Sequence, residues 1–127
     1  MIPQQTTQRR MLIVDDEARI CRVLAEYFSL KGYDVTTVNG GEEALARAET
    51  SLPDVVLLDL LMPGMSGLEA LTILTRRYPT LPVIIVSAAD QQDAAQQTLQ
   101  LGAKAFLSKP VDFAALSRAV DQCWASS

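Results

Sequence analysis

The sequence contains no histidine, two cysteines and no long hydrophobic run. Without histidine, the chain can form neither a Ser-His-Asp triad nor a His-ligated zinc site, and it cannot itself carry a phosphohistidine. Cys21 and Cys123 are too few for a disulfide framework, and both fall in helical patterns, which favours reduced thiols. No apolar run approaches the roughly 20 residues of a membrane-spanning helix. The polar start, MIPQQTTQRR, lacks the apolar core of a secretory signal, so we expect a cytoplasmic protein.

The composition is that of one folded domain. The chain has 127 residues, of which 49% are hydrophobic and 20% are charged, and this balance excludes disorder, collagen and coiled coil as the main structure. The net charge of −4 argues against a surface built to bind nucleic acid. We predict a flexible tail over residues 1–9 and a single domain over residues 10–127.

Short apolar runs rich in β-branched residues alternate five times with amphipathic helical stretches, as in an α/β fold. The predicted strands are 11–14, 34–38, 54–58, 82–86 and 104–107. The third and fourth are almost continuously apolar, which is typical of strands covered on both faces of a parallel sheet. The alternation predicts a doubly wound sheet with helices on both faces.

The predicted helices carry start and stop signals. The first helix covers 17–31 and ends at Gly32, and the second covers 41–49. Ser66 and Glu69 form the pattern of a capping box at the start of a third helix that runs to about Arg77. Asp90 and Asp112 are candidate N-caps of the fourth and fifth helices.

Polar side chains follow four of the five predicted strands. They are Asp15, Asp16 and Glu17 after the first, Asp59 after the third, Ser87 after the fourth and Lys109 after the fifth. The second strand ends at Val38-Asn39 and offers no comparable group. Ligands of open parallel sheets bind outside the carboxyl ends of the strands, so these groups are expected to share one site.

The three carboxylates of Asp15, Asp16 and Asp59 would need a counter-charge at one site. Each close pair repels by on the order of 4 kcal/mol at an effective dielectric constant near 20, and a single lysine is insufficient to neutralise three. Oxygen ligands without histidine or thiolate suit Mg²⁺, which leaves room for a phosphate oxygen. An aspartate beside such a cation is a plausible nucleophile toward a phosphoryl group, with Ser87 and Lys109 as donors to the new oxygens.

The chain resembles the bacterial response-regulator receiver domain of two-component systems, the family that includes the chemotaxis response regulator. The resemblance covers about residues 10–124. Its motifs are Val14-Asp15-Asp16-Glu17, Leu58-Asp59-Leu60-Leu61-Met62-Pro63-Gly64 with Gly67, Val86-Ser87-Ala88, Gly102-Ala103 and Ser108-Lys109-Pro110. It implies a flavodoxin-like sheet of order 2-1-3-4-5 with five helices.

The resemblance also implies residue roles. Asp59 would be the phosphoacceptor, and Mg²⁺ would be held directly by Asp16, Asp59 and the backbone carbonyl of Leu61, with Asp15 acting through a bound water. Ser87 would bond the phosphoryl group and Lys109 would pair with it. Ser87 and Phe106 would be the switch residues, although an aromatic side chain on the last strand is usually a core or edge packing residue. The Lys109–Pro110 bond would be cis.

The implied activity is a phosphorylation-controlled switch rather than a turnover enzyme. A sensor histidine kinase would donate the phosphoryl group, and the partner downstream would be an effector domain or protein. A homodimer through the fourth helix, fifth strand and fifth helix is possible. The domain could act alone or be the N-terminal part of a longer regulator. In the family, the residues two positions after the phosphoacceptor and two positions after Ser87 help to set how fast the phosphoryl group is lost. They are Leu61 and Ala89 here, and neither can orient a water molecule. We therefore expect a phosphorylated state that lives longer than in family members with polar groups at these positions.

Two alternatives from other classes remain. An aspartyl phosphatase of the haloacid-dehalogenase type would need a second aspartate two residues after the nucleophile, where Leu61 stands. A degenerate receiver used as a constitutive docking scaffold would be expected to lack one of the acidic residues or the lysine, and all are present.

Overall fold

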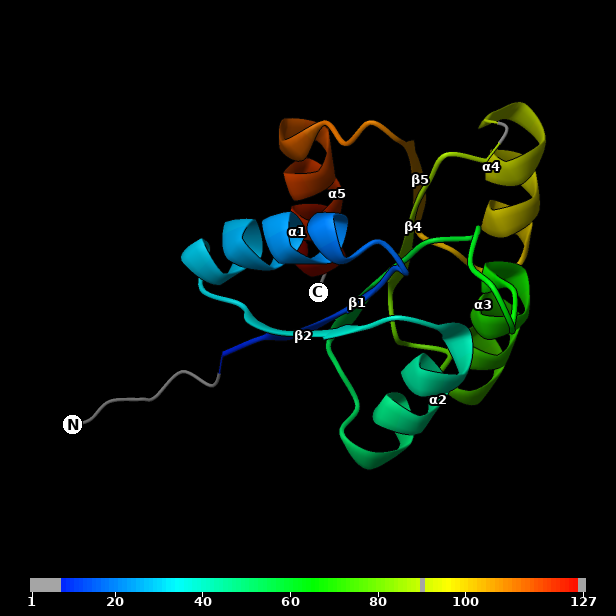
Figure 1. The fold of residues 1–127 in the computed structure, drawn as a ribbon, viewed down its shortest axis with the longest axis horizontal. Coiled ribbons are helices and arrows are strands. Elements are labelled where there is room, and N and C mark those ends of the chain that lie inside the picture. The colour runs from blue at the N-terminus through cyan, green and yellow to red at the C-terminus, as the bar shows by residue number, and fades with distance from the viewer. Residues whose placement is uncertain (1–7, 90, 126–127) are drawn as a thin grey trace.

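A computed structural model describes residues 8–89 and 91–125 of the chain. Five strands alternate with five helices, as the sequence predicts (Figure 1). The strands are β1 (Arg10–Val14), β2 (Asp34–Val38), β3 (Val55–Leu58), β4 (Val83–Ser87) and β5 (Ala105–Ser108). The helices are α1 (Ala18–Leu30), α2 (Gly41–Thr50), α3 (Gly67–Arg77), α4 (Gln91–Gln100) and α5 (Phe113–Ala125).

All five strands form one parallel sheet in the order β2-β1-β3-β4-β5, which confirms the predicted topology. The register places Val14 opposite Val38 on one side and opposite Leu58 on the other. Ser87 pairs with Ser108 at the end of β4 and β5. Since the strands are parallel and in this register, their carboxyl ends meet at one edge of the sheet.

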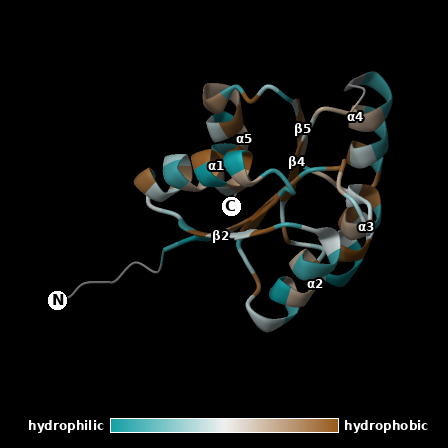
Figure 2. Cartoon of the chain, in the orientation of Figure 1, coloured by the Kyte–Doolittle hydropathy of each residue, from teal (hydrophilic) through white to brown (hydrophobic). Residues whose placement is uncertain are grey.

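Alternating residues of the central strands face two separate cores. In β1, Leu12 and Val14 pack with α2 and α3, whereas Met11 and Ile13 pack with α1 and α5. Figure 1 shows the same division, with α2, α3 and α4 on one side of the sheet and α1 and α5 on the other. The residues of β3 and β4 are all buried, and β4 is correspondingly hydrophobic in Figure 2. Burial on both sides is why these two strands have no polar alternation.

The predicted helix signals are seen where the structure describes them. The Ser66 hydroxyl accepts from the Glu69 backbone N–H, and the Glu69 carboxylate accepts from the Ser66 N–H, so the capping box of α3 is confirmed. The Asp112 carboxylate caps α5 by accepting from the Ala115 N–H at 3.1 Å. Gly32 follows α1 with φ +99°, a left-handed conformation that glycine adopts without steric cost. Asp90 lies outside the described residues.

At the amino ends of the strands, Trp124 of α5 contacts residues that precede β1 and β2. The Trp124 indole donates to the Tyr33 hydroxyl at 2.7 Å, and the Arg9 guanidinium lies 4.2 Å from the centre of the Trp124 ring. Gln8 donates to the Gly32 carbonyl at 3.2 Å. Residues 1–7 of the expected tail lie outside the described residues. Among the helices described, none combines the length and the apolar character that crossing a membrane requires.

Candidate functional site

The carboxyl ends of four strands carry the polar side chains that the sequence singles out. Asp15 follows β1, Asp59 follows β3, Ser87 is the last residue of β4 and Lys109 follows β5. Backbone hydrogen bonds continue the sheet through these positions. The Asp59 N–H donates to the Val14 carbonyl at 3.0 Å, and the Lys109 N–H donates to the Ser87 carbonyl at 2.9 Å. The strand register therefore sets the positions from which these side chains extend.

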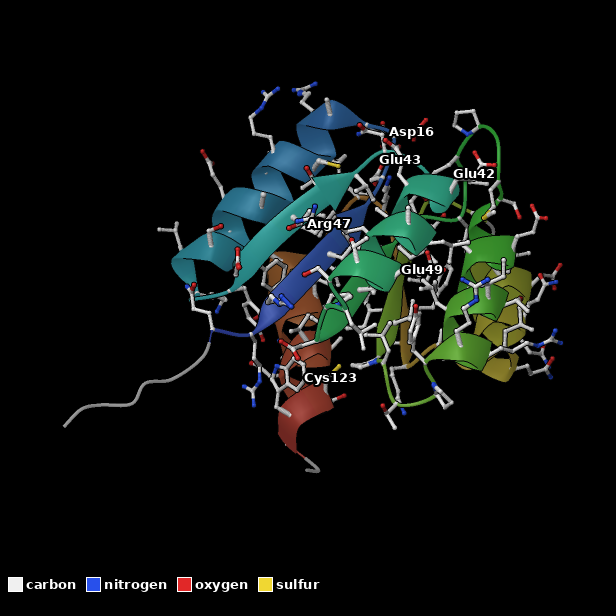
Figure 3. The ribbon with its side chains drawn as sticks, turned by 90° about the horizontal axis from the view of Figure 1, so that it is seen from below. Asp16, Glu42, Glu43, Arg47, Glu49 and Cys123 are labelled. Carbon is white, nitrogen blue, oxygen red and sulfur yellow. The ribbon has the colours of Figure 1, made fainter. Side chains whose placement is uncertain are left out.

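Three carboxylates meet at this edge, as expected. One oxygen each from Asp15, Asp16 and Asp59 lies within 4.8 Å of the others. Asp15 and Asp59 are buried, being 3% and 4% exposed, whereas Asp16 is exposed. In Figure 3, Asp16 lies at the same end of the molecule as Glu43, and Cys123 lies at the opposite end. The site thus has two buried carboxylates with an exposed one at its mouth.

Lys109 places its ammonium among the carboxylates. Its Nζ donates to Asp15 Oδ2 at 2.8 Å, to Glu17 Oε1 at 2.9 Å and to Asp59 Oδ2 at 3.4 Å. The Lys109 side chain is 12% exposed, so these contacts are only partly screened by solvent. The Lys109–Pro110 peptide bond is cis, as the resemblance implies.

The environment shifts the pKa of both Asp15 and Lys109. Burial raises the pKa of Asp15 above its usual 3.8, and the Asp59 charge adds to this, although hydrogen bonds from Lys109 and Glu17 act in the opposite direction. Burial alone would lower the pKa of Lys109, but its bonds to Asp15 and Glu17 and the Asp59 charge outweigh that effect and raise it. The lysine therefore stays charged, while the protonation of Asp15 costs less than usual.

The loop after β3 is held close to the acidic cluster. The Leu61 N–H donates to Asp59 Oδ1 at 3.2 Å, and the Gly67 N–H donates to the Leu60 carbonyl at 3.2 Å. A Cβ atom at Gly67 would overlap the backbone of Asp59 and Leu60, so only glycine allows the start of α3 to approach this closely. The loop can thus bring the backbone of Leu61 back beside Asp59.

Ser87 and Phe106 occupy neighbouring strands. Ser87 is fully buried, and its hydroxyl oxygen accepts from the Ala89 N–H at 3.2 Å. Phe106 is half-buried and packs against the core shared by α2, α3 and α4. This packing is compatible with either interpretation of Phe106, so its switch role stays a prediction.

From the sequence, one residue at this edge was missed and another was assigned no role. Asn39, after β2, donates from its amide to the Asp15 carbonyl at 3.3 Å, so the second strand does contribute a polar group to the site. Glu17 was noted after β1 but given no role, and it bonds Lys109. The position of Asn39 directly after a strand could have indicated that it belongs to the site. Asparagine is also a common turn residue, however, and this gave no reason to assign Asn39 a contact.

The donor set fits a divalent cation such as Mg²⁺. Two buried carboxylates, an exposed one and a nearby loop backbone offer oxygen ligands, while the single ammonium leaves the cluster with excess negative charge. Lys109 neutralises part of that negative charge beside Asp15 and Asp59. A cation bound at the exposed side of the cluster, beside Asp16, would neutralise more of it.

Fold and site together define a class: a flavodoxin-like α/β protein with an acidic site and a lysine at the carboxyl end of its sheet. The family model described as "Response regulator receiver domain" matches residues 11–121. The chain belongs to this family, and it is a receiver domain of the kind found in two-component systems.

Individual proteins agree with this assignment. The chain is 44% identical over 100 residues to the DNA-binding transcriptional regulator NtrC of Klebsiella pneumoniae, covering 79% of this chain and 21% of that protein. It is 36% identical over 102 residues to the alkaline phosphatase synthesis transcriptional regulatory protein PhoP of Bacillus subtilis, covering 80% of this chain and 42% of that protein. The chain thus spans less than half the length of these two curated relatives.

A solved structure gives the same result in three dimensions. The crystal structure of the CheX-CheY-BeF3-Mg²⁺ complex from Borrelia burgdorferi has a chain that superposes with a TM-score of 0.86 at 30% identity. The match covers 91% of this chain and 89% of that one.

Proposed function

We propose that this receiver domain accepts a phosphoryl group on Asp59 with Mg²⁺ bound, and that the modification switches a protein-interaction surface. The observation that carries the proposal is the meeting of three carboxylates and the Lys109 ammonium at the carboxyl end of the sheet. Mg²⁺ would be held by Asp16, Asp59 and the Leu61 carbonyl, with Asp15 acting through a water. When bound, it would supply positive charge beside the incoming phosphoryl oxygens.

The chemistry is a phosphoryl transfer to a carboxylate. An Asp59 oxygen attacks the phosphorus of a phosphohistidine or of a small acyl phosphate, and a new P–O bond forms as the bond to the donor breaks. The electron pair of the broken bond leaves with the donor, and the product is an acyl phosphate on Asp59. The aspartate is consumed until the phosphoryl group is lost to water, so the domain is modified rather than acting as a turnover enzyme.

Ser87 and Lys109 would recognise the modified side chain. The phosphoryl group brings a charge of about −1.5 to −2 at neutral pH with three acceptor oxygens. The Lys109 ammonium is already beside Asp59, and the Ser87 hydroxyl is on the neighbouring strand. A shift of Ser87 toward the phosphoryl group would leave space into which Phe106 could turn, which would couple the site to the surface of β5.

The partners follow from the same interpretation. A sensor histidine kinase would be the donor, because receiver domains are the partners of such kinases in two-component systems. An effector domain or protein would read the switched surface, and a homodimer through α4, β5 and α5 is one form that this surface could take. The receiver unit would cover residues 10–127, and its place of action would be the cytoplasm. NtrC, which is named as a DNA-binding transcriptional regulator and of which this chain covers 21%, supports an effector domain attached to the receiver.

The proposal is tested by intact-protein mass spectrometry after incubation with acetyl phosphate and Mg²⁺. We expect one added phosphoryl group in the parent, none in Asp59→Asn and none without Mg²⁺. Asp121→Asn, an exposed aspartate on α5, is the matched control and should be modified like the parent. Binding of beryllofluoride, measured by calorimetry, provides a second readout. Failure of the parent in both assays would contradict the proposal.

A further inference from the structure

All three donors of the Lys109 ammonium are directed at carboxylates. An ammonium has three N–H bonds, and Lys109 has three carboxylate partners: Asp15, Glu17 and Asp59. The contact with Asp59 is the longest, at 3.4 Å, against 2.8 Å and 2.9 Å for the other two. The donor that points at Asp59 can turn to a phosphoryl oxygen there, but the two shorter bonds hold the ammonium toward Asp15 and Glu17. A close approach to that oxygen therefore requires one of these two bonds to lengthen.

Glu17 is the partner that can be released most easily. Its side chain is 59% exposed, whereas that of Asp15 is 4% exposed. An exposed carboxylate regains water when the contact breaks, but a buried one would lose its counter-charge without regaining water. The Asp15–Lys109 bond is thus expected to persist while the Glu17–Lys109 bond opens.

The local backbone explains why Glu17 reaches Lys109. Glu17 is the N-cap residue of α1, and its N–H is fixed by Asp15 Oδ1 at 2.9 Å. Its side chain makes no cap hydrogen bond to α1 and bonds Lys109 at 2.9 Å instead. Glu17 is therefore anchored at its backbone, and its side chain can exchange between the lysine and water.

We propose that Glu17 is a positioning residue that holds one donor of Lys109 in the unmodified protein and competes with the phosphoryl group for it. The inference rests on the proposed function of Asp59. Glu17 would bias the site toward the unmodified state, and its removal would make the modified state more stable. Two effects are possible in principle, the direct contact with Lys109 and the negative charge near the site, and one substitution separates them.

The test uses beryllofluoride at saturating Mg²⁺, with the dissociation constant measured by calorimetry. Glu17→Gln removes the charge and weakens the contact. Glu17→Asp keeps the charge but is one methylene shorter, so its carboxylate is withdrawn from Lys109. Since exposed ion pairs are weak, we expect both variants to bind about two- to fivefold more tightly than the parent. Glu26→Gln, an exposed glutamate of the same helix, should leave the constant unchanged.

Three results would overturn the inference while leaving the proposed function intact. They are an unchanged constant in Glu17→Gln, a weaker one, and tighter binding in Glu17→Gln alone, which would assign the effect to charge. Failure of the parent to bind beryllofluoride would instead contradict the proposed function.

The contact itself is tested separately in the metal-free, unmodified protein. Nitrogen-15 NMR of the lysine side chains measures how fast the ammonium protons of Lys109 exchange with water. We expect faster exchange in Glu17→Gln and Glu17→Asp than in the parent, with the exposed Lys104 as an internal reference. Equal exchange rates at Lys109 would overturn the inference even if beryllofluoride binding could not be measured.

Discussion

At the scale of single residues, the site is organised around one buried ion pair. Asp15 is held by the Lys109 ammonium on one oxygen and by the Glu17 N–H on the other. Its backbone carbonyl also accepts from the Cys21 thiol at 3.2 Å and from the Asn39 amide at 3.3 Å. Burial nevertheless raises its pKa, which means that these contacts offset only part of the loss of water.

This balance predicts the effect of Asp15→Asn on stability in the metal-free protein. A group whose pKa is higher in the folded than in the unfolded state adds stability below its unfolded pKa, and that stability is lost as the pH rises through the folded pKa. Burial destabilises the charged form of Asp15, whereas asparagine is neutral at every pH and keeps an oxygen for the Glu17 N–H. We expect a higher free energy of unfolding for the variant at pH 7, measured with urea, and a smaller difference at pH 4.

The control is Asp121→Asn, which changes the same charge at an exposed position. It should show no comparable gain. A loss of stability in Asp15→Asn at pH 7 would contradict the prediction and would show that the bond to Lys109 outweighs burial.

Two apolar residues, one two positions after Asp59 and one two positions after Ser87, give a prediction about the lifetime of the proposed phosphoryl group. Leu61 and Ala89 carry no group that could orient an attacking water. The double variant Leu61→Asn with Ala89→Glu should lose the phosphoryl group faster than the parent, as followed by intact mass after removal of the donor. Leu61→Met, which keeps an apolar side chain of similar size, should decay like the parent. Equal rates in the double variant and the parent would contradict the hypothesis.

At the scale of elements, the start of helix α3 holds the loop after β3 close to the site. Helix α3 begins at Gly67, close to the backbone of Asp59 and Leu60, and is fixed there by the capping box of Ser66 and Glu69. The cap thus lies at the end of the loop that follows Asp59. Its loss should be felt in the stability of the whole domain, because α3 supplies Leu71 and Leu74 to the core.

We predict that Ser66→Ala lowers the free energy of unfolding by about 1 kcal/mol, the usual cost of an N-cap hydroxyl. Urea unfolding followed by circular dichroism would measure this. Ser29→Ala is the matched control, because Ser29 is exposed within α1, where alanine is a good helix former. A cost no larger than that of the control would show that the capping box contributes nothing to stability.

At the scale of the whole molecule, the acidic site couples cation binding to folding. Asp15 and Asp59 repel each other while buried, so a cation that binds the folded state alone should raise the melting temperature. At a hundred times the dissociation constant, such binding adds about 2.7 kcal/mol to the free energy of unfolding.

Differential scanning calorimetry with and without Mg²⁺, at matched ionic strength, would check this. Asp16→Asn should show a much smaller rise, since Asp16 is one of the proposed direct ligands. A shift of equal size in parent and variant would argue for a general salt effect instead.

The whole fold was predictable because hydrophobic periodicity carries it. Buried faces leave a pattern of apolar residues that can be seen within a short stretch of sequence. Examples are the nearly continuous apolar runs of β3 and β4 and the helical spacing of apolar residues in α1. The predicted ends of the elements differ from the observed ends by about a residue. Ser87, for example, is the last residue of β4, whereas the prediction places it after the strand. The meeting of Asp15, Asp16 and Asp59 was also predictable, because parallel strands bring their carboxyl ends together.

The partners of each side chain were decided by the tertiary structure alone. The sequence places Glu17 and Asn39 directly after strands, but it does not show what their side chains contact. Asn39 bonds the Asp15 carbonyl across from β2 to β1, and Glu17 bonds Lys109, which follows β5. The sequence likewise does not show the length of the Lys109–Asp59 contact or the pKa of Asp15. Sequence patterns determine which residues are buried and which end of the sheet they reach, whereas the sharing of one ammonium among three carboxylates depends on packing between residues up to 94 positions apart.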